Sequence, residues 1–183
     1  MRKLSATNQL RADHDQIRRL EKITLRCSEE LKKGADVPFS DIEKITIVIS
    51  EFLDAIHYGR EEDSYFPCVA SYDRLKDKIR ALMIEHEFGR KSARQISRHL
   101  QRWKNGEDAR EPVARYLKVY SIYLYDHLNK ENKFFDEAEA EVLSKEEEEE
   151  MYQQYMSVTA TVKKIDDMIK EIDWLESRPW FSS

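Results

Sequence analysis

The sequence predicts an all-α protein in which an up-down-up-down four-helix bundle is followed by a long C-terminal fifth helix. Three observations support this fold class. Apolar residues recur every three or four positions along most of the chain, Gly and Pro number only four each, and the stretches between the apolar stripes are short. Because short connections join helices that run antiparallel, we expect the bundle at residues 1–140 and the fifth helix at residues 141–183.

Turn-forming residues and a proline delimit the first two helices. The first helix is expected over residues 6–33, since its apolar stripe stops at Gly34. Ser40 and Glu43 have the spacing of a capping box, which predicts the start of the second helix. That helix should break near Pro67, because proline lacks the backbone N–H that a helix interior requires.

Similar signals delimit the remaining helices. The third helix should begin near Ser71 and end at the Asn-Gly pair that finishes at Gly106. The fourth helix has Pro112 in its first turn, where a proline is tolerated. Ser144 and Glu147 form a second capping box, which opens the fifth helix.

The fifth helix has an apolar seam whose members alternate three and four residues apart, as in a coiled coil. The seam consists of Met151, Tyr155, Val158, Val162, Ile165, Ile169 and Ile172. Such a helix either packs on its own bundle or forms a dimer interface, so the chain is a monomer or a homodimer through helix five. We favour the intramolecular packing.

Composition excludes several classes of protein. The net charge of -5 gives no electrostatic reason to expect a nucleic-acid partner. No apolar run approaches the roughly 18 residues that suggest a membrane span, and the first residues lack the apolar stretch of a signal peptide. Cys27 and Cys68 form no disulfide framework and should act as small apolar residues. We therefore expect a cytoplasmic protein without a membrane partner.

Four of the five histidines lie within apolar stripes, where each buried imidazole needs partners for its ring nitrogens. They also form a repeat. In each half of the bundle, a histidine on the first helix is followed, at similar distance, by a histidine and a glutamate four residues apart on the second helix. The predicted metal ligands are His14, His57, Glu61, His86, His127 and Glu131.

The spacing within the repeat has a physical reason. Residues four apart lie on one face of a helix, so a His-x-x-x-Glu pair can bind one cation. Carboxylates can bridge two cations, and the other two helices add one imidazole each. The result is a site for two metals. A mixture of imidazole and carboxylate ligands suits iron or manganese, and it is less specific for zinc. Without cations, two carboxylates buried in an apolar core would be costly.

Less specific explanations exist for each residue. A single His-x-x-x-Glu is more often a surface hydrogen bond or ion pair, and the whole chain could be a structural bundle that needs no metal. Two occurrences in a duplicated frame favour the metal site. The fifth histidine, His99, falls on the opposite side of the third helix from His86 and is expected at the surface. A ferritin-like site needs Glu-x-x-His pairs, and none precedes any predicted ligand.

The ligand pattern resembles the hemerythrin-like, or HHE cation-binding, domain family over roughly residues 8 to 140. The resemblance rests on His14, His57-Tyr-Gly-Arg-Glu61, the segment from Glu61 to Phe66-Pro67, Glu85-His86 and His127-Leu-Asn-Lys-Glu131. It implies a four-helix bundle around two iron ions, with two bridging carboxylates and an oxo or hydroxo bridge.

One position departs from the oxygen-carrying members of that family. They have a further histidine four residues after the third-helix histidine, and here that position is Arg90. The resulting four-histidine, two-glutamate set is similar to that of bacterial iron-centre repair proteins, although no cysteine precedes His14 as in their N-terminal region. The absence of that further histidine makes open coordination positions possible on both irons, which favours reactivity with small ligands.

The resemblance implies functions between which the sequence does not decide. One is a di-iron protein that binds or senses oxygen or nitric oxide. The other is a redox enzyme or iron donor in oxidative and nitrosative stress defence, which reduces peroxide or nitric oxide or repairs iron centres. Whether the chain is an enzyme, which small ligand it meets and whether binding is reversible cannot be read from these residues.

Several residues near the predicted ligands have two interpretations. Gly89 and Ala93 lie on the ligand face, where small side chains either leave a pocket for a diatomic ligand or allow close helix packing. Tyr120 and Tyr123 are core aromatics or could hydrogen-bond a ligand or donate an electron. His14 and His86 are the leading histidines of the two halves, and one of the acidic residues that flank them could orient an imidazole. These flanking residues are Asp13, Asp15, Glu85 and Glu87.

Overall fold

The structure, a computed structural model, describes residues 4–182. Its elements follow in the order α1 (Ala6–Lys33), α2 (Phe39–Val48), η1 (Ile49–Tyr58), η2 (Glu61–Tyr65), α3 (Phe66–Ala70), α4 (Lys76–Lys104), α5 (Arg110–Glu141), α6 (Lys145–Ser157), α7 (Thr159–Glu176) and α8 (Pro179–Ser182). Both η segments are π-helical, and the described residues contain no strand. The prediction of an all-α chain is confirmed.

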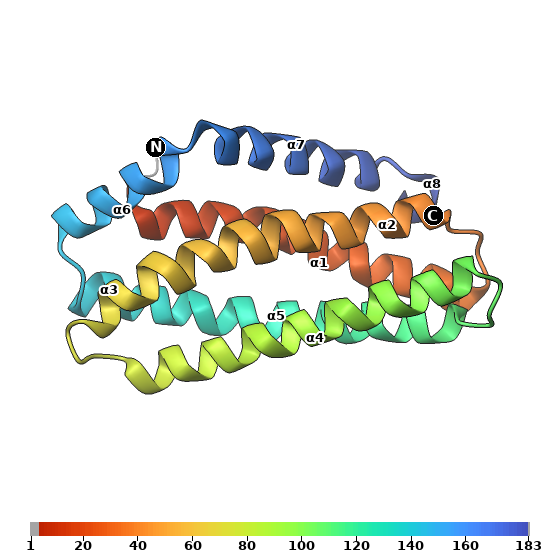
Figure 1. The fold of residues 1–183 in the computed structure, drawn as a ribbon, viewed down its shortest axis with the longest axis horizontal. Coiled ribbons are helices and arrows are strands. Elements are labelled where there is room, and N and C mark those ends of the chain that lie inside the picture. Colours follow the sequence, from red (N-terminus) through yellow and green to blue (C-terminus); the bar gives the residue numbers. More distant parts are fainter. Residues whose placement is uncertain (1–3, 183) are drawn as a thin grey trace.

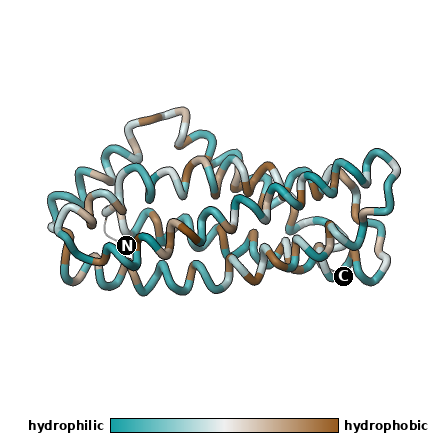
Figure 2. Tube along the Cα trace, turned by 60° about the horizontal axis from the view of Figure 1, so that its bottom comes forward, coloured by the Kyte–Doolittle hydropathy of each residue, from teal (hydrophilic) through white to brown (hydrophobic). Residues whose placement is uncertain are grey.

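Four long rods form the bundle (Figure 1). The rods are α1, the continuous run from α2 to α3, α4 and α5, and each contacts its neighbours around the ring. The C-terminal helices lie outside this ring, where α7 runs along α1 and α2 (Figure 1). Hydrophilic residues prevail along the helices with hydrophobic ones interspersed, as amphipathic helices require (Figure 2). The predicted bundle with an added C-terminal helix is therefore observed.

The limits of α1 agree with the prediction. Its first turn is capped by Ser5, whose hydroxyl accepts a hydrogen bond from the backbone N–H of Asn8. Its last turn ends at Gly34, whose φ of 87° lies in the left-handed region that glycine adopts at little cost. The predicted end of α4 is likewise observed, since this helix stops at Lys104 before the Asn-Gly pair.

The second rod differs from the prediction at both ends. It begins at Phe39 after Pro38, and the predicted capping box is wrong because the Ser40 hydroxyl bonds Asp41 instead of capping the helix. The predicted break at Pro67 is also wrong, since the helix continues to Ala70. The turn before the proline is π-helical, which widens it and accommodates a residue without an N–H.

The third rod begins later than predicted. The expected start near Ser71 is wrong, because the chain turns there and α4 starts only at Lys76. Asp73 and Leu75 both have positive φ, at 55° and 57°, and left-handed residues cannot continue a right-handed helix. This turn reverses the chain and makes α4 antiparallel to the second rod.

The C-terminal helix is bent rather than continuous. The capping box of Ser144 and Glu147 is present as predicted. However, Val158 has an extended backbone conformation and is 52% exposed, so the single heptad seam is interrupted there. The bend turns α7 along the bundle, where it buries Met168, Ile172 and Leu175 in the core.

The core consists of two apolar clusters separated along the bundle axis. One contains Leu10 and Phe134, and the other contains Ile17 and Leu124. On α1, Leu10 and Ile17 lie on either side of His14. On α5, Leu124 and Phe134 lie on either side of His127 and Glu131, so the polar cluster lies between the two apolar ones. Within the described residues, no helix is both long and apolar enough to cross a bilayer.

Candidate metal centre

The structure brings all six predicted ligands together at one level of the bundle. His14 comes from α1, His57 from η1, Glu61 from η2, His86 from α4, and His127 and Glu131 from α5. None of these residues is more than 3% exposed. The helical spacing of the duplicated pairs thus places four imidazoles and two carboxylates in the interior.

The four imidazoles direct their Nε2 atoms at the two carboxylates. The Glu131 carboxylate is 3.2 Å from Nε2 of His14 and 2.8 Å from Nε2 of His127. The Glu61 carboxylate is 3.5 Å from Nε2 of His57 and 3.4 Å from Nε2 of His86. His86 also lies 3.1 Å from Glu131, so it contacts both carboxylates.

Several of these inward atoms have no hydrogen-bond partner, which tests whether cations fit. The unpartnered buried atoms include Nε2 of His14, His57 and His127, both carboxylate oxygens of Glu61 and one oxygen of Glu131. Buried polar atoms are normally satisfied, and these are the atoms that ligate metals in proteins. The residues present therefore fit a buried cation site.

The potential ligand atoms fall into two groups that share one carboxylate. The first group is formed by His14, His57, Glu61 and Glu131, and the second by His86, His127 and Glu131. Within each group the atoms lie within 4.8 Å of one another. A shared glutamate is what two adjacent cations would need in order to be bridged.

Each imidazole is held from outside through its Nδ1 atom. His57 faces Asp13 at 3.4 Å, and His127 faces Glu85 at 2.8 Å. In both pairs the acceptor directly precedes the leading histidine of the same half of the bundle. An Nδ1–H that donates to such a partner leaves the Nε2 lone pair free to bind a cation.

The two leading histidines have outer partners of a second type. Nδ1 of His86 lies 2.6 Å from the Glu62 carboxylate, and Nδ1 of His14 lies 3.0 Å from the Asn132 amide oxygen. Glu62 and Asn132 each directly follow a candidate ligand glutamate. Sequence reasoning missed both, although their equivalent positions in the two halves were a usable signal.

The flanking acidic residues behave differently from one another. Asp13 and Glu85 orient imidazoles, as expected of at least one residue of this kind. Each contacts the second histidine of its half, His57 or His127, rather than the histidine next to it in sequence. Glu87 instead pairs with Arg90 at 2.8 Å. Arg90 itself points to Asp54 at 2.7 Å. The position at which oxygen-carrying family members have a further histidine therefore supplies no ligand here.

Burial and charge shift the pKa values of the cluster in the absence of a cation. Burial and the Glu131 charge raise the pKa of Glu61 to about 8. Burial acts in the same direction on Glu131, but His127 and the other imidazoles hold its pKa well below the usual range. Although burial opposes it, the Glu61 carboxylate raises the pKa of His57 to about 10. Without cations, protons compensate the buried negative charge.

Two tyrosines pack directly against two of the candidate ligand histidines. The ring of Tyr58 stacks on His86 with centroids 3.7 Å apart, and Tyr123 stacks on His127 at 5.1 Å. Their hydroxyls share a hydrogen bond of 2.6 Å. The Tyr123 ring fills the space above Gly89, where a Cβ would lie 2.5 Å from Cε1 of the tyrosine. The close-packing explanation of Gly89 is therefore the correct one.

The fifth histidine lies outside the cluster, as predicted. His99 is half-buried rather than at the surface as expected, because it stacks on Tyr116 at 5.5 Å between α4 and α5. Cys27 and Cys68 are unpaired and also lie outside the candidate ligand groups. The donor set in the described residues is thus limited to imidazole and carboxylate.

Comparisons with known proteins agree with this donor set. The chain matches the family described as Hemerythrin HHE cation binding domain over residues 5–138, a span that contains all six candidate ligands. Neither the curated proteins nor the solved structures gave a significant match. The chain therefore belongs to the hemerythrin HHE cation-binding domain family.

Proposed function

We propose that the cluster holds two iron ions as a non-haem di-iron centre and that this centre binds or senses a small molecule such as oxygen or nitric oxide. One observation carries the proposal. Imidazole Nε2 atoms and carboxylate oxygens converge from four helices, and most of them have no partner within the protein. Iron bound there would supply Lewis-acid and redox chemistry toward a diatomic ligand.

The donor set supports iron and a count of two. Four imidazoles and two carboxylates without a thiolate suit iron or manganese better than a softer metal. The two ligand groups share Glu131, and Glu61 has one oxygen facing His57 and the other facing His86. Each cation would therefore have two imidazoles and a share of both carboxylates.

The surrounding side chains would limit a ligand to small size. Phe135 packs against His14 with ring centroids 5.2 Å apart, and Tyr58 covers His86. Both aromatic residues are at most 1% exposed, so bulk water is excluded from the ligand cluster. A dry, enclosed centre favours a small uncharged molecule over a charged or bulky substrate.

Metal analysis combined with visible spectroscopy tests this proposal. We expect two iron ions per chain, and a spectrum of the reduced protein that changes on exposure to oxygen or nitric oxide and returns when the gas is removed. His127→Ala should lower the metal content, whereas His99→Ala, at a histidine outside the cluster, should not. Full metal content in His127→Ala would refute the assignment of the site.

A second function, a redox enzyme or iron donor, is favoured by a different observation. Tyr123 connects the cluster to the surface, since it stacks on His127 and also lines an open cavity with the exposed side chains of Phe88 and Ile122. An electron donor could approach the centre there. Steady consumption of peroxide or nitric oxide with a chemical electron donor, or iron transfer to a metal-free acceptor, would support this function. Reversible gas binding without either activity would exclude it.

A further inference from the structure

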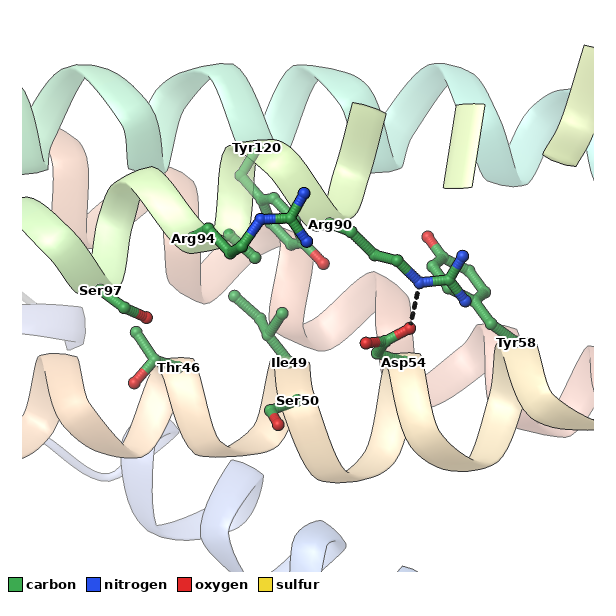
Figure 3. A pocket seen from close by; sticks show the side chains of 10 residues that line it. Thr46, Ile49, Ser50, Asp54, Tyr58, Arg90, Arg94, Ser97 and Tyr120 are labelled. Carbon is green, nitrogen blue, oxygen red and sulfur yellow. Dashed lines mark hydrogen bonds and ion pairs between the residues drawn. The ribbon is translucent and has the colours of Figure 1, made fainter. Parts of the chain in front are cut away.

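A cavity of about 260 Å³ lies between the second rod and α4, on the outer side of Tyr58 (Figure 3). Arg90 and Arg94 project into it from α4, and Tyr120 reaches it from α5. Ile49 and Asp54 of η1 form the opposite wall. None of these residues is a candidate metal ligand, so the cavity is separate from the metal centre.

The hydroxyl of Tyr120 faces this cavity and has no partner within the described protein. The residue is 1% exposed, and within residues 4–182 its hydroxyl makes no hydrogen bond. Figure 3 shows the hydroxyl directed into the space between α4 and η1. Because a buried tyrosine O–H ordinarily finds an acceptor, the cavity is suited to hold a molecule that supplies one.

Among the three charged residues that line the cavity, Asp54, Arg90 and Arg94, one cation has no carboxylate partner in the described structure. Arg90 is fully compensated, since its guanidinium lies 2.7 Å from Asp54, 2.9 Å from Glu62 and 2.8 Å from Glu87. Arg94 forms no ion pair within the described part of the chain. A ligand with a single negative charge would complement this balance, whereas a dianion would exceed it.

The remaining lining is apolar and limits the size of a ligand. Ile49 and Ala93 contribute aliphatic surface, and Tyr58 and Tyr120 contribute aromatic surface. The volume is slightly below that of typical drug-sized pockets, which begin at about 300 Å³. The site therefore fits an anionic group attached to a short apolar body.

We propose that this cavity binds a small monocarboxylate. The carboxylate accepts hydrogen bonds from the Tyr120 hydroxyl and the Arg94 guanidinium, and the apolar part lies against Ile49 and the Tyr58 ring. This inference does not depend on the identity of the metal or on the proposed reaction, because the cavity is formed by residues outside the ligand cluster.

Titration of the purified protein with benzoate tests the proposal, with benzamide as a neutral molecule of the same shape. We expect saturable benzoate binding at one site by calorimetry and a shift of the Ile49 methyl resonances by NMR. Benzamide should bind at least about tenfold more weakly, because it lacks the charge that Arg94 would meet.

Three variants locate the binding. Tyr120→Phe and Arg94→Gln should each weaken benzoate binding by about tenfold or more, while Arg98→Gln, an exposed arginine of the same helix outside the cavity, should leave it unchanged. Unaltered melting temperatures would confirm that these variants are folded. Equal binding of benzamide, absence of saturable benzoate binding, tighter binding of inorganic phosphate, or full affinity in both cavity variants would overturn the proposal.

Discussion

At the scale of single residues, the Asp13 carboxylate contacts both a candidate ligand and a buried cation. It lies 3.4 Å from Nδ1 of His57 and 2.8 Å from Nη1 of Arg60, and all three side chains are buried. Although burial opposes ionisation, His57 and Arg60 lower the pKa of Asp13. A guanidinium in the interior is tolerable only with such a partner, so Asp13 both orients a candidate ligand and compensates a buried charge.

Removal of this carboxylate should be costly. We expect Asp13→Ala to lower the free energy of unfolding by about 3–5 kcal/mol, because Arg60 would remain buried without its anion. Glu137→Ala removes a surface pair with Lys78 and should cost at most about 1 kcal/mol. Urea denaturation of both metal-free variants checks the contrast, and equal losses would contradict this role of Asp13.

Gly89 is required for a steric reason that can be tested in the same way. In Gly89→Ala the added Cβ would meet the Tyr123 ring, and we expect a loss of about 1–3 kcal/mol from this overpacking. Gly59 is also helical but has nothing within 4 Å of a Cβ, so Gly59→Ala should be neutral or stabilising by up to about 1 kcal/mol. If thermal melting showed the same change for both, the packing argument would fail.

At the scale of elements, the periodicity of the sequence was sufficient to predict the long helices and the six side chains that converge in the core. The His-x-x-x-Glu repeat identified six side chains that the structure places together, because helical spacing determines which face they share. The positions at which a helix is interrupted were harder to predict. Whether a proline or a valine interrupts a helix depends on local backbone geometry, as with the π-helical turn before Pro67 and the extended Val158.

The outer partners of the imidazoles were only partly predictable for a related reason. A residue next to a ligand in sequence points to a different side of its helix, so Asp13 reaches a histidine on another rod. Assigning such a partner requires the rotation of two helices relative to each other. Sequence spacing within one helix carries no information about that rotation.

The packing of α7 gives a prediction about the oligomeric state. Ile172 is fully buried against the bundle of its own chain, whereas Ile169 on the same helix is half-buried. Ile172→Ala should lower the free energy of unfolding by about 2–5 kcal/mol, and Ile169→Ala by less. If α7 packs intramolecularly, denaturation should be independent of protein concentration. A loss of stability on dilution would instead indicate a dimer through this helix.

At the scale of the whole molecule, the candidate ligands are divided equally between two helical hairpins. The N-terminal half supplies His14, His57 and Glu61, and the C-terminal half supplies the other three. Bound cations would therefore connect the two halves through their shared carboxylates. Ligands must be deprotonated to bind a cation, so cation affinity should rise with pH. The stability of the metal-free protein should change in the opposite direction.

The metal-free protein should lose stability as the pH rises. The pKa values of Glu61, His57 and His127 are raised to about 8, 10 and 9. Groups whose pKa is higher in the folded than in the unfolded state stabilise the fold below the unfolded pKa, and this contribution is lost as the pH rises through the folded value. We expect a lower melting temperature at about pH 9 than at about pH 7 without metal, and proton release when metal binds, measurable by calorimetry in two buffers. An unchanged melting temperature would contradict these shifts.

The outer hydrogen bonds of the four imidazoles form a closed circuit around the bundle. Asp13 joins α1 to the second rod, Glu62 joins the second rod to α4, Glu85 joins α4 to α5, and Asn132 joins α5 back to α1. None of these bonds uses an atom that would hold a cation, so the circuit persists when the centre is emptied. We therefore expect the helices to stay joined when the centre holds no cation, so that a cation could enter or leave without unfolding the protein.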